Sequence, residues 1–259
     1  MKFIVKKLGG ENAAQLHNSA HNIYDDFIKG KNQAIVVSAM RNPEFNTTDK
    51  LILLGKELGK KEINEKLVFE IINNIKIFHL NLLECEMLCS KDKLKNIIEI
   101  LFDNLENNIR YFINKSTESF NSLFFPEKNN DYSIELENGE KLSIIGFGEK
   151  VSAKIISGVI DTMSLKSICS KSIDLGNIIS DIDLENKSRK EVFDMLTLKL
   201  SDIVIEKNKG GNIPVLSGYI GSFPEGIEER IGRGYSDATA AITAVGLARK
   251  GYGVIIEIQ

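Results

Sequence analysis

A run rich in apolar and β-branched residues, QAIVVSA at residues 33–39, constrains the fold of this 259-residue chain more than any other feature. A run without polar alternation is typical of a strand that is buried on both faces, as in a parallel sheet. Further strands are expected at residues 3–5, 212–219 and 252–258, with helical segments between them. Strands that alternate with helices predict an α/β fold with crossover connections.

Apolar residues recur at helical spacing in most of the remaining sequence. The expected helices cover residues 13–28, 47–58, most of 62–115, 143–163, 189–205 and 236–249. Thr48 or Asp49 is a candidate N-cap of the second helix, because either side-chain oxygen accepts from free backbone N–H groups. Residues 116–140 are polar and mixed, with Pro126, and predict a loop or a small excursion.

Composition excludes several classes of protein. Hydrophobic residues make up 42% and charged residues 27%, the balance of a globular chain with a real core. The net charge is −3, which argues against a nucleic-acid partner and requires local groups to hold any anionic ligand. No apolar run is long enough for a signal peptide or membrane span, so we expect a cytoplasmic protein without a membrane partner. The three cysteines fit a reducing compartment, and Cys85 and Cys89 are expected to be buried.

Two candidate ligand-binding segments follow the first two strands. Lys7 stands just before Gly9 and Gly10, and such glycines let backbone N–H groups approach an anion while the lysine adds a full charge. The glycine pair also fits a simple turn, and the P-loop pattern is absent. Ser38 and Thr48 follow the second strand, where small hydroxyls suit either ligand contacts or helix capping.

Two further candidates lie beside later helices. Glu149, in GFGEK, begins a helix, where its carboxylate fits either a substrate ammonium or an exposed helix surface. The segment GRGYSD places glycines around Arg233, whose guanidinium can grip a carboxylate with two hydrogen bonds. Ser236 and Asp237 lead directly into a helix, so capping is an alternative role for both. His17 and His21 share a helix face, but the Glu of the H-E-x-x-H zinc motif is absent, so no metal site is predicted.

In this order, the segments resemble the motifs of aspartate kinases, which belong to the amino acid kinase superfamily. The matched segments, in chain order, are KLGG at 7–10 with KFGG, VVSA at 36–39 with VVSA, TD at 48–49 with the acceptor-side threonine, FGEKVS at 147–152 with GE-(R/K)-LS, PVLSGYIG at 214–221 with PVVTGFIG, and GRGYSD at 232–237 with GRGxSD. The GRGY form is similar to the fungal-type branch. Each segment alone is weak evidence for the family, whereas the full set in this order is specific to it.

The resemblance implies an amino acid kinase domain over residues 1–259, a three-layer αβα sandwich with a mainly parallel sheet that is C-terminally incomplete. The implied reaction is ATP-dependent phosphorylation of the side-chain carboxylate of L-aspartate, a step toward lysine, threonine and methionine. It also implies Mg²⁺ carried with ATP, and a possible homodimer. The implied roles are transition-state charge stabilisation by Lys7, orientation of Lys7 by Asp237, nucleotide contacts by Gly9, Gly10, Gly218 and Gly221, and aspartate contacts by Ser38, Thr48, Glu149, Arg233 and Ser236.

Two departures from the family pattern leave other hypotheses open. Glu11 and Asn12 stand where the family has Thr-Ser, and an acidic side chain there repels phosphates unless it points away or is paired. The sequence also ends at the strand that, in the family, precedes the adenine-binding segment and the regulatory domains. The alternatives are an aspartate kinase sequence that is incomplete as given or is completed by another chain, a degenerate kinase-fold protein that binds an amino acid or a partner without phosphoryl transfer, and a kinase of a different carboxylate.

Overall fold

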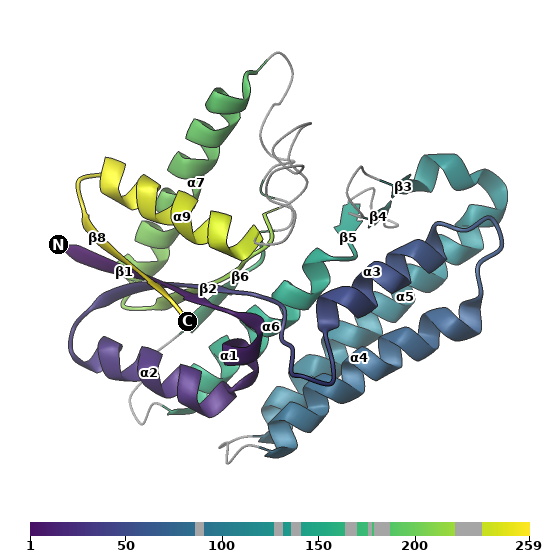
Figure 1. The fold of residues 1–259 in the computed structure, drawn as a ribbon, viewed down its shortest axis with the longest axis horizontal. Coiled ribbons are helices and arrows are strands. Elements are labelled where there is room, and N and C mark those ends of the chain that lie inside the picture. The colour runs from purple at the N-terminus through teal and green to yellow at the C-terminus, as the bar shows by residue number, and fades with distance from the viewer. Residues whose placement is uncertain are drawn as a thin grey trace.

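A five-stranded sheet forms the centre of the protein (Figure 1). The structure, a computed structural model, describes residues 1–85, 91–126, 132–135, 141–163, 170–175, 178, 187–220 and 235–259. The strands, in spatial order, are β6 (Ser170–Ile173), β7 (Ile213–Ser217), β2 (Asn32–Val37), β1 (Lys2–Leu8) and β8 (Gly253–Ile258). Every neighbouring pair is parallel, which confirms the predicted sheet type.

Helices cover both faces of this sheet and make the predicted three-layer αβα sandwich (Figure 1). On one face lie α2 (Leu16–Ile28) and α6 (Gly146–Met163), and on the other lie α7 (Arg189–Lys209) and α9 (Tyr235–Arg249). Alternate strand residues serve the two cores, because successive side chains point to opposite faces. Val5 and Val36 pack with α7 and α9, whereas Ile35 and Val37 pack with α2 and α6.

A helical extension stands beside the sandwich (Figure 1). It contains α3 (Thr47–Leu58), α4 (Glu65–Cys85) and α5 (Lys91–Leu123), followed by a small antiparallel sheet of β3 (Phe124–Pro126), β4 (Tyr132–Glu135) and β5 (Lys141–Ser143). The prediction of a loop from residue 116 is wrong in part, because α5 continues to Leu123. The predicted small excursion corresponds to the three short strands. No described helix has the length and apolarity to cross a membrane.

Other details of the structure also differ from the predictions. The first expected helix is two helices, α1 (Gly10–Ala14) and α2, which meet at Gln15. Asn46, not Thr48 or Asp49, caps α3: its side-chain oxygen accepts from the N–H groups of both those residues. Strand β6 was not predicted, because its sequence SKSI carries little apolar signal. Cys85 is exposed at the end of α4, contrary to the expected burial, and Cys89 lies outside the described residues.

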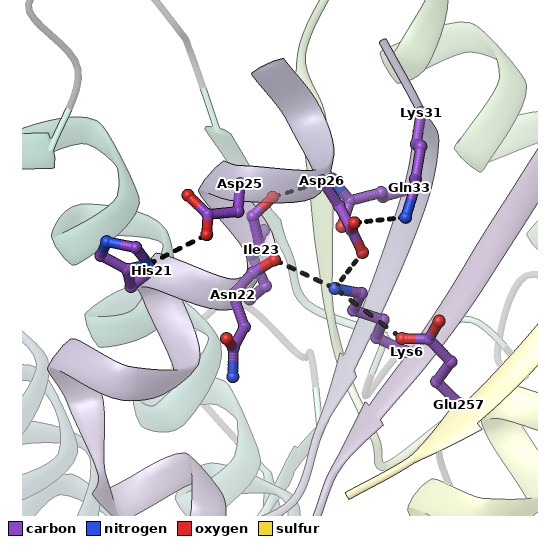
Figure 2. Close-up of polar contacts among 9 residues, drawn as sticks. All are labelled: Lys6, His21, Asn22, Ile23, Asp25, Asp26, Lys31, Gln33 and Glu257. Atoms are coloured by element: carbon purple, nitrogen blue, oxygen red, sulfur yellow. Dashed lines mark hydrogen bonds and ion pairs between the residues drawn. The ribbon is translucent and has the colours of Figure 1, made fainter. Parts of the chain in front are cut away.

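A buried lysine links the first strand to helix α2 and strand β8 (Figure 2). The Lys6 side chain is only 3% exposed, and its Nζ lies 2.6 Å from Asp26 Oδ2 on α2 and 3.8 Å from Glu257 on β8. It also donates to the Asn22 carbonyl at 3.1 Å. Lys31, just before β2, holds the other Asp26 oxygen at 2.5 Å. Burial alone would raise the pKa of Asp26, but hydrogen bonds from Lys31 and Lys6 lower it below its usual value of 3.8.

Candidate functional site

The carboxyl ends of the central strands bring most of the predicted site residues together. Lys7 lies near the end of β1, and Ser38 and Gly218 directly follow β2 and β7. Backbone hydrogen bonds close this edge: the Ser38 N–H donates to the Leu8 carbonyl at 3.0 Å, and the Gly218 N–H to the Val37 carbonyl at 2.9 Å. Ligand sites of open α/β sheets form at this end of the strands.

Lys7 and Asp237 form the predicted pair. Lys7 Nζ lies 2.9 Å from Asp237 Oδ1 in the first turn of α9, and the lysine side chain is only 12% exposed. Lys7 points to the α9 face of the sheet, whereas its neighbour Lys6 points to the α2 face, because side chains alternate along a strand. Its amino group also lies 3.8 Å from the point that a Cβ on Gly9 would occupy. A positive charge therefore stands beside the glycine loop, with its orientation set by a carboxylate.

Glu149, in the first turn of α6, carries the most perturbed carboxyl group near this edge. Burial raises its pKa to about 8, although the Lys7 charge and the Tyr219 backbone N–H both lower it. The residue as a whole is partly buried, but its Oε2 atom is buried and has no hydrogen-bond partner. A buried carboxylate oxygen without a partner is costly, and a bound cation would relieve that cost.

Two serines link the second strand to the last helix. Ser38 Oγ and Ser236 Oγ lie 2.6 Å apart, although 198 positions separate them in sequence. Ser236 lies inside the first turn of α9, and its hydroxyl faces the residue that follows β2. In the next turn of α9, the Thr239 hydroxyl donates to the Gly218 carbonyl, which fixes this helix against the end of β7.

Close backbone packing explains the predicted glycines. A Cβ on Gly10 would lie 2.5 Å from the Ala39 carbonyl oxygen, and one on Gly218 would lie 2.4 Å from Ser236 Cβ. The Gly9 N–H donates to the Gln259 carbonyl at 2.7 Å, so the glycine loop also holds the end of β8. These contacts give each glycine a structural role, which is compatible with the predicted nucleotide contacts but does not test them.

The start of α3 lies against the start of α6. A Cβ on Gly148 would approach within 3.0 Å of Ala39 Cβ, Leu51 Cδ1 and Thr47 Cγ2. Thr48, which is partly buried, follows Thr47 in sequence, and Glu149 follows Gly148. Two predicted ligand contacts, Arg233 and Gly221, lie outside the described residues. Within the described ranges, no cluster of three His, Cys, Asp or Glu side chains has the geometry of a metal site.

An ion pair that the sequence did not reveal neutralises Glu11. Arg41 Nη2 lies 3.3 Å from Glu11 Oε1, and both side chains are largely exposed, at 48% and 61%. The acidic residue in the glycine loop is thus paired, one of the two conditions under which it need not repel phosphates. Sequence reasoning missed Arg41 because nothing in its spacing from Glu11, 30 positions away, indicates the contact. Sequence reasoning also missed the Tyr219 N–H that hydrogen bonds to Glu149.

The model of the amino acid kinase family matches residues 2–250, almost the whole chain. The chain belongs to the amino acid kinase family. Among its curated relatives, the aspartokinase of Schizosaccharomyces pombe is 33% identical over 104 residues, which cover 40% of this chain and 19% of the relative. The aspartokinase of Candida albicans is 24% identical over 256 residues, which cover 95% of this chain and 42% of the relative. These relatives confirm the resemblance to aspartate kinases, fungal ones included.

Solved aspartokinase structures share the fold of this amino acid kinase family member. Aspartokinase III of E. coli, solved in complex with lysine and aspartate, superposes with a TM-score of 0.60 at 19% identity, over 100% of this chain and 49% of that one. The aspartate kinase of Clostridium acetobutylicum superposes with a TM-score of 0.54 at 16% identity, over 96% of this chain and 46% of that one. The chain therefore spans less than half the length of the proteins that it matches.

Proposed function

We propose that this protein takes part in ATP-dependent transfer of a phosphoryl group to the side-chain carboxylate of L-aspartate, giving 4-phospho-L-aspartate. The proposal is supported by the similarity to aspartokinases and by one observation above all. The buried, partnerless Oε2 of Glu149 lies in the same site as the Lys7 amino group. This combination offers an anchor for a substrate ammonium beside a cation for the transferring phosphoryl group.

The roles of the other residues follow from their positions around this pair. Lys7 would balance the charge that develops on the transferring group, and Asp237 would keep its amino group in place. The hydroxyls of Ser38 and Ser236, which lie at the same edge of the sheet, would donate to the acceptor carboxylate. Arg233 and Thr48 complete the proposed aspartate contacts. The proposed product lies on the route to lysine, threonine and methionine.

ATP with its Mg²⁺ would meet this edge through Lys7 and the glycine segments. The residues present fit a polyphosphate, because a lysine amino group lies 3.8 Å from the Cβ position of Gly9 and the nearby acidic residue Glu11 is paired. Gly9, Gly10, Gly218 and Gly221 would offer backbone contacts to the nucleotide. The bound ion would supply charge neutralisation of the phosphates.

A hydroxylamine-trapping assay tests the proposed reaction. With ATP, Mg²⁺ and L-aspartate, we expect a coloured hydroxamate, because hydroxylamine captures an acyl phosphate. Reactions with L-glutamate in place of aspartate, and without any amino acid, are the controls. Signal with glutamate alone would assign a different carboxylate to the enzyme, and no signal with either would refute transfer by this chain.

The pH dependence of aspartate binding tests the role of Glu149. Its carboxyl must be charged to hold an ammonium, and its pKa in the free protein is raised to about 8. We therefore expect affinity to rise with pH, by roughly tenfold per pH unit below pH 8, and to level off above it. Calorimetry over this range measures the effect. Glu149→Gln should bind weakly and with little pH dependence; an unchanged slope would assign the titration to another group.

Amino acid binding without phosphoryl transfer is a second candidate function. It is favoured by Glu11, which places a carboxylate in the glycine loop where the resembled motif has a hydroxyl. In that case aspartate would raise the melting temperature while the hydroxamate assay gave no signal. A kinase would give both responses, so running the two measurements on one preparation separates the candidates.

A further inference from the structure

We propose that Arg41 is an anion-binding residue of this site and that Glu11 occupies it until the polyphosphate of the nucleotide takes its place. The inference deepens the proposed function, on which it rests, by assigning a residue that no motif indicated. Glu11 then competes with the ligand, because the Arg41 guanidinium cannot form its full set of hydrogen bonds with Glu11 and with a phosphate at the same time. Weakly charged ligands would therefore not displace Glu11 from Arg41, whereas strongly charged ones would.

The backbone fixes Arg41 beside the glycine loop. Its N–H donates to the Gly10 carbonyl at 3.1 Å, and the residue forms a bridge with Asn46 at the base of the turn that leads into α3. Its side-chain stem crosses Gly10: a Cβ at that position would lie 2.9 Å from Arg41 Cγ and 3.3 Å from Cδ. Any larger residue at position 10 would displace the arginine. The absence of a side chain at Gly10 thus serves the placement of the guanidinium.

The pair with Glu11 is weak enough to exchange. The two side chains are 48% and 61% exposed, and the distance between Nη2 and Oε1 is 3.3 Å. Exposed pairs of this kind contribute little to stability because water screens them. A phosphate group offers two negative charges and a geometry that matches the guanidinium fork, so it competes well against one carboxylate. Lys7, whose amino group lies near Gly9 at the same loop, would add to the attraction.

A double-mutant cycle on the full chain tests the exchange, with inorganic tripolyphosphate and Mg-ATP as probes in calorimetry. We expect Arg41→Gln to weaken tripolyphosphate binding roughly ten- to a hundredfold, the range for a lost charge-assisted hydrogen bond. Glu11→Gln should tighten it several-fold, because the competitor is gone. In the Glu11→Gln background, Arg41→Gln should still weaken binding at least tenfold. Arg249→Gln, which breaks a similarly exposed pair with Asp194, is the matched control and should change nothing.

Each alternative gives a different result. If Arg41 only neutralises Glu11, Arg41→Gln will weaken binding in the wild-type background and have no effect once Glu11 is Gln. That outcome overturns the inference, as does the absence of tripolyphosphate binding in the wild type. Circular dichroism melts of all variants should agree within a few degrees, since the pair is exposed. The hydroxamate assay tests the proposed function separately. Anion binding that depends on Arg41, without formation of a hydroxamate, would support the inference and refute the proposed kinase activity.

Discussion

Lys7→Met is expected to lower the rate of hydroxamate formation roughly a thousandfold while leaving the fold intact. In the proposed reaction, the lysine contributes a full positive charge where negative charge develops on the phosphoryl group, and its side chain is mostly shielded from water. Loss of folding stability should be small, because its partner Asp237 is half exposed and can be solvated in the variant. Turnover and melting temperature, measured on the same sample, check both parts.

Two further variants sharpen this test. Lys7→Arg keeps the charge but replaces a compact ammonium by a planar fork, so we expect it to restore little activity. Asp237→Asn should reduce turnover less than Lys7→Met, because the proposed role of Asp237 is to orient the lysine and not to contact the phosphoryl group. Full activity in Lys7→Met would show that Lys7 is not part of the transfer machinery. A cooperative loss of structure in that variant would make the residue structural instead.

Lys6→Met is expected to do the opposite: to destabilise the fold by about 3 kcal/mol and leave the chemistry of the folded protein largely unchanged. Removal of one member of a buried ion pair leaves the other charge uncompensated, and Asp26 would retain only Lys31. For a chain of this size, the melting temperature should fall by roughly 6–12 °C. Chemical denaturation with urea gives the free energy of unfolding directly.

The same strand provides the control for this variant. Lys2 is exposed on β1, and Lys2→Met should change the free energy of unfolding by less than about 0.5 kcal/mol. Asp26→Asn combined with Lys6→Met should recover part of the lost stability, because no buried charge is then left unpaired. An equal effect of the Lys2 and Lys6 substitutions would show that the buried cluster contributes nothing specific.

The Lys6 cluster also has a defined pH window. The folded-state pKa of Asp26 is lowered below 3.8, so its contribution to stability is present above that value and is lost as pH falls through the folded-state pKa. The stabilisation is therefore expected to persist at neutral pH and to disappear only in acid. The pKa of Glu149 is shifted in the opposite direction, to about 8, so this carboxyl group changes its charge near neutral pH.

The neighbouring lysines show how far sequence reasoning reached into the site. The motif order indicated Lys7 and Asp237, and the structure places the two in contact. The burial of Lys6 was not predicted. The sequence pattern of a short strand with two adjacent lysines does not distinguish a buried lysine from an exposed one. Its partners come from α2 and β8, which are separated from it by about 20 and 250 positions.

The sequence by itself determined the α/β class, the parallel sheet and the family of this protein. Continuous apolar runs such as residues 34–37 indicate burial on both faces, and glycine, lysine and serine at the ends of such runs are local signals. Strand β6 and the continuation of α5 escaped prediction, because their sequences are polar and their structure depends on neighbouring elements.

Only the tertiary structure decided which charges are paired and which are not. The ion pair of Glu11 with Arg41 and the 2.6 Å contact of Ser38 with Ser236 join segments whose separation in sequence carries no information about distance in space. The raised pKa of Glu149 likewise results from burial, which the helix sequence around it leaves open. Electrostatic interactions depend on distance and on exclusion of water, and both are properties of the folded chain.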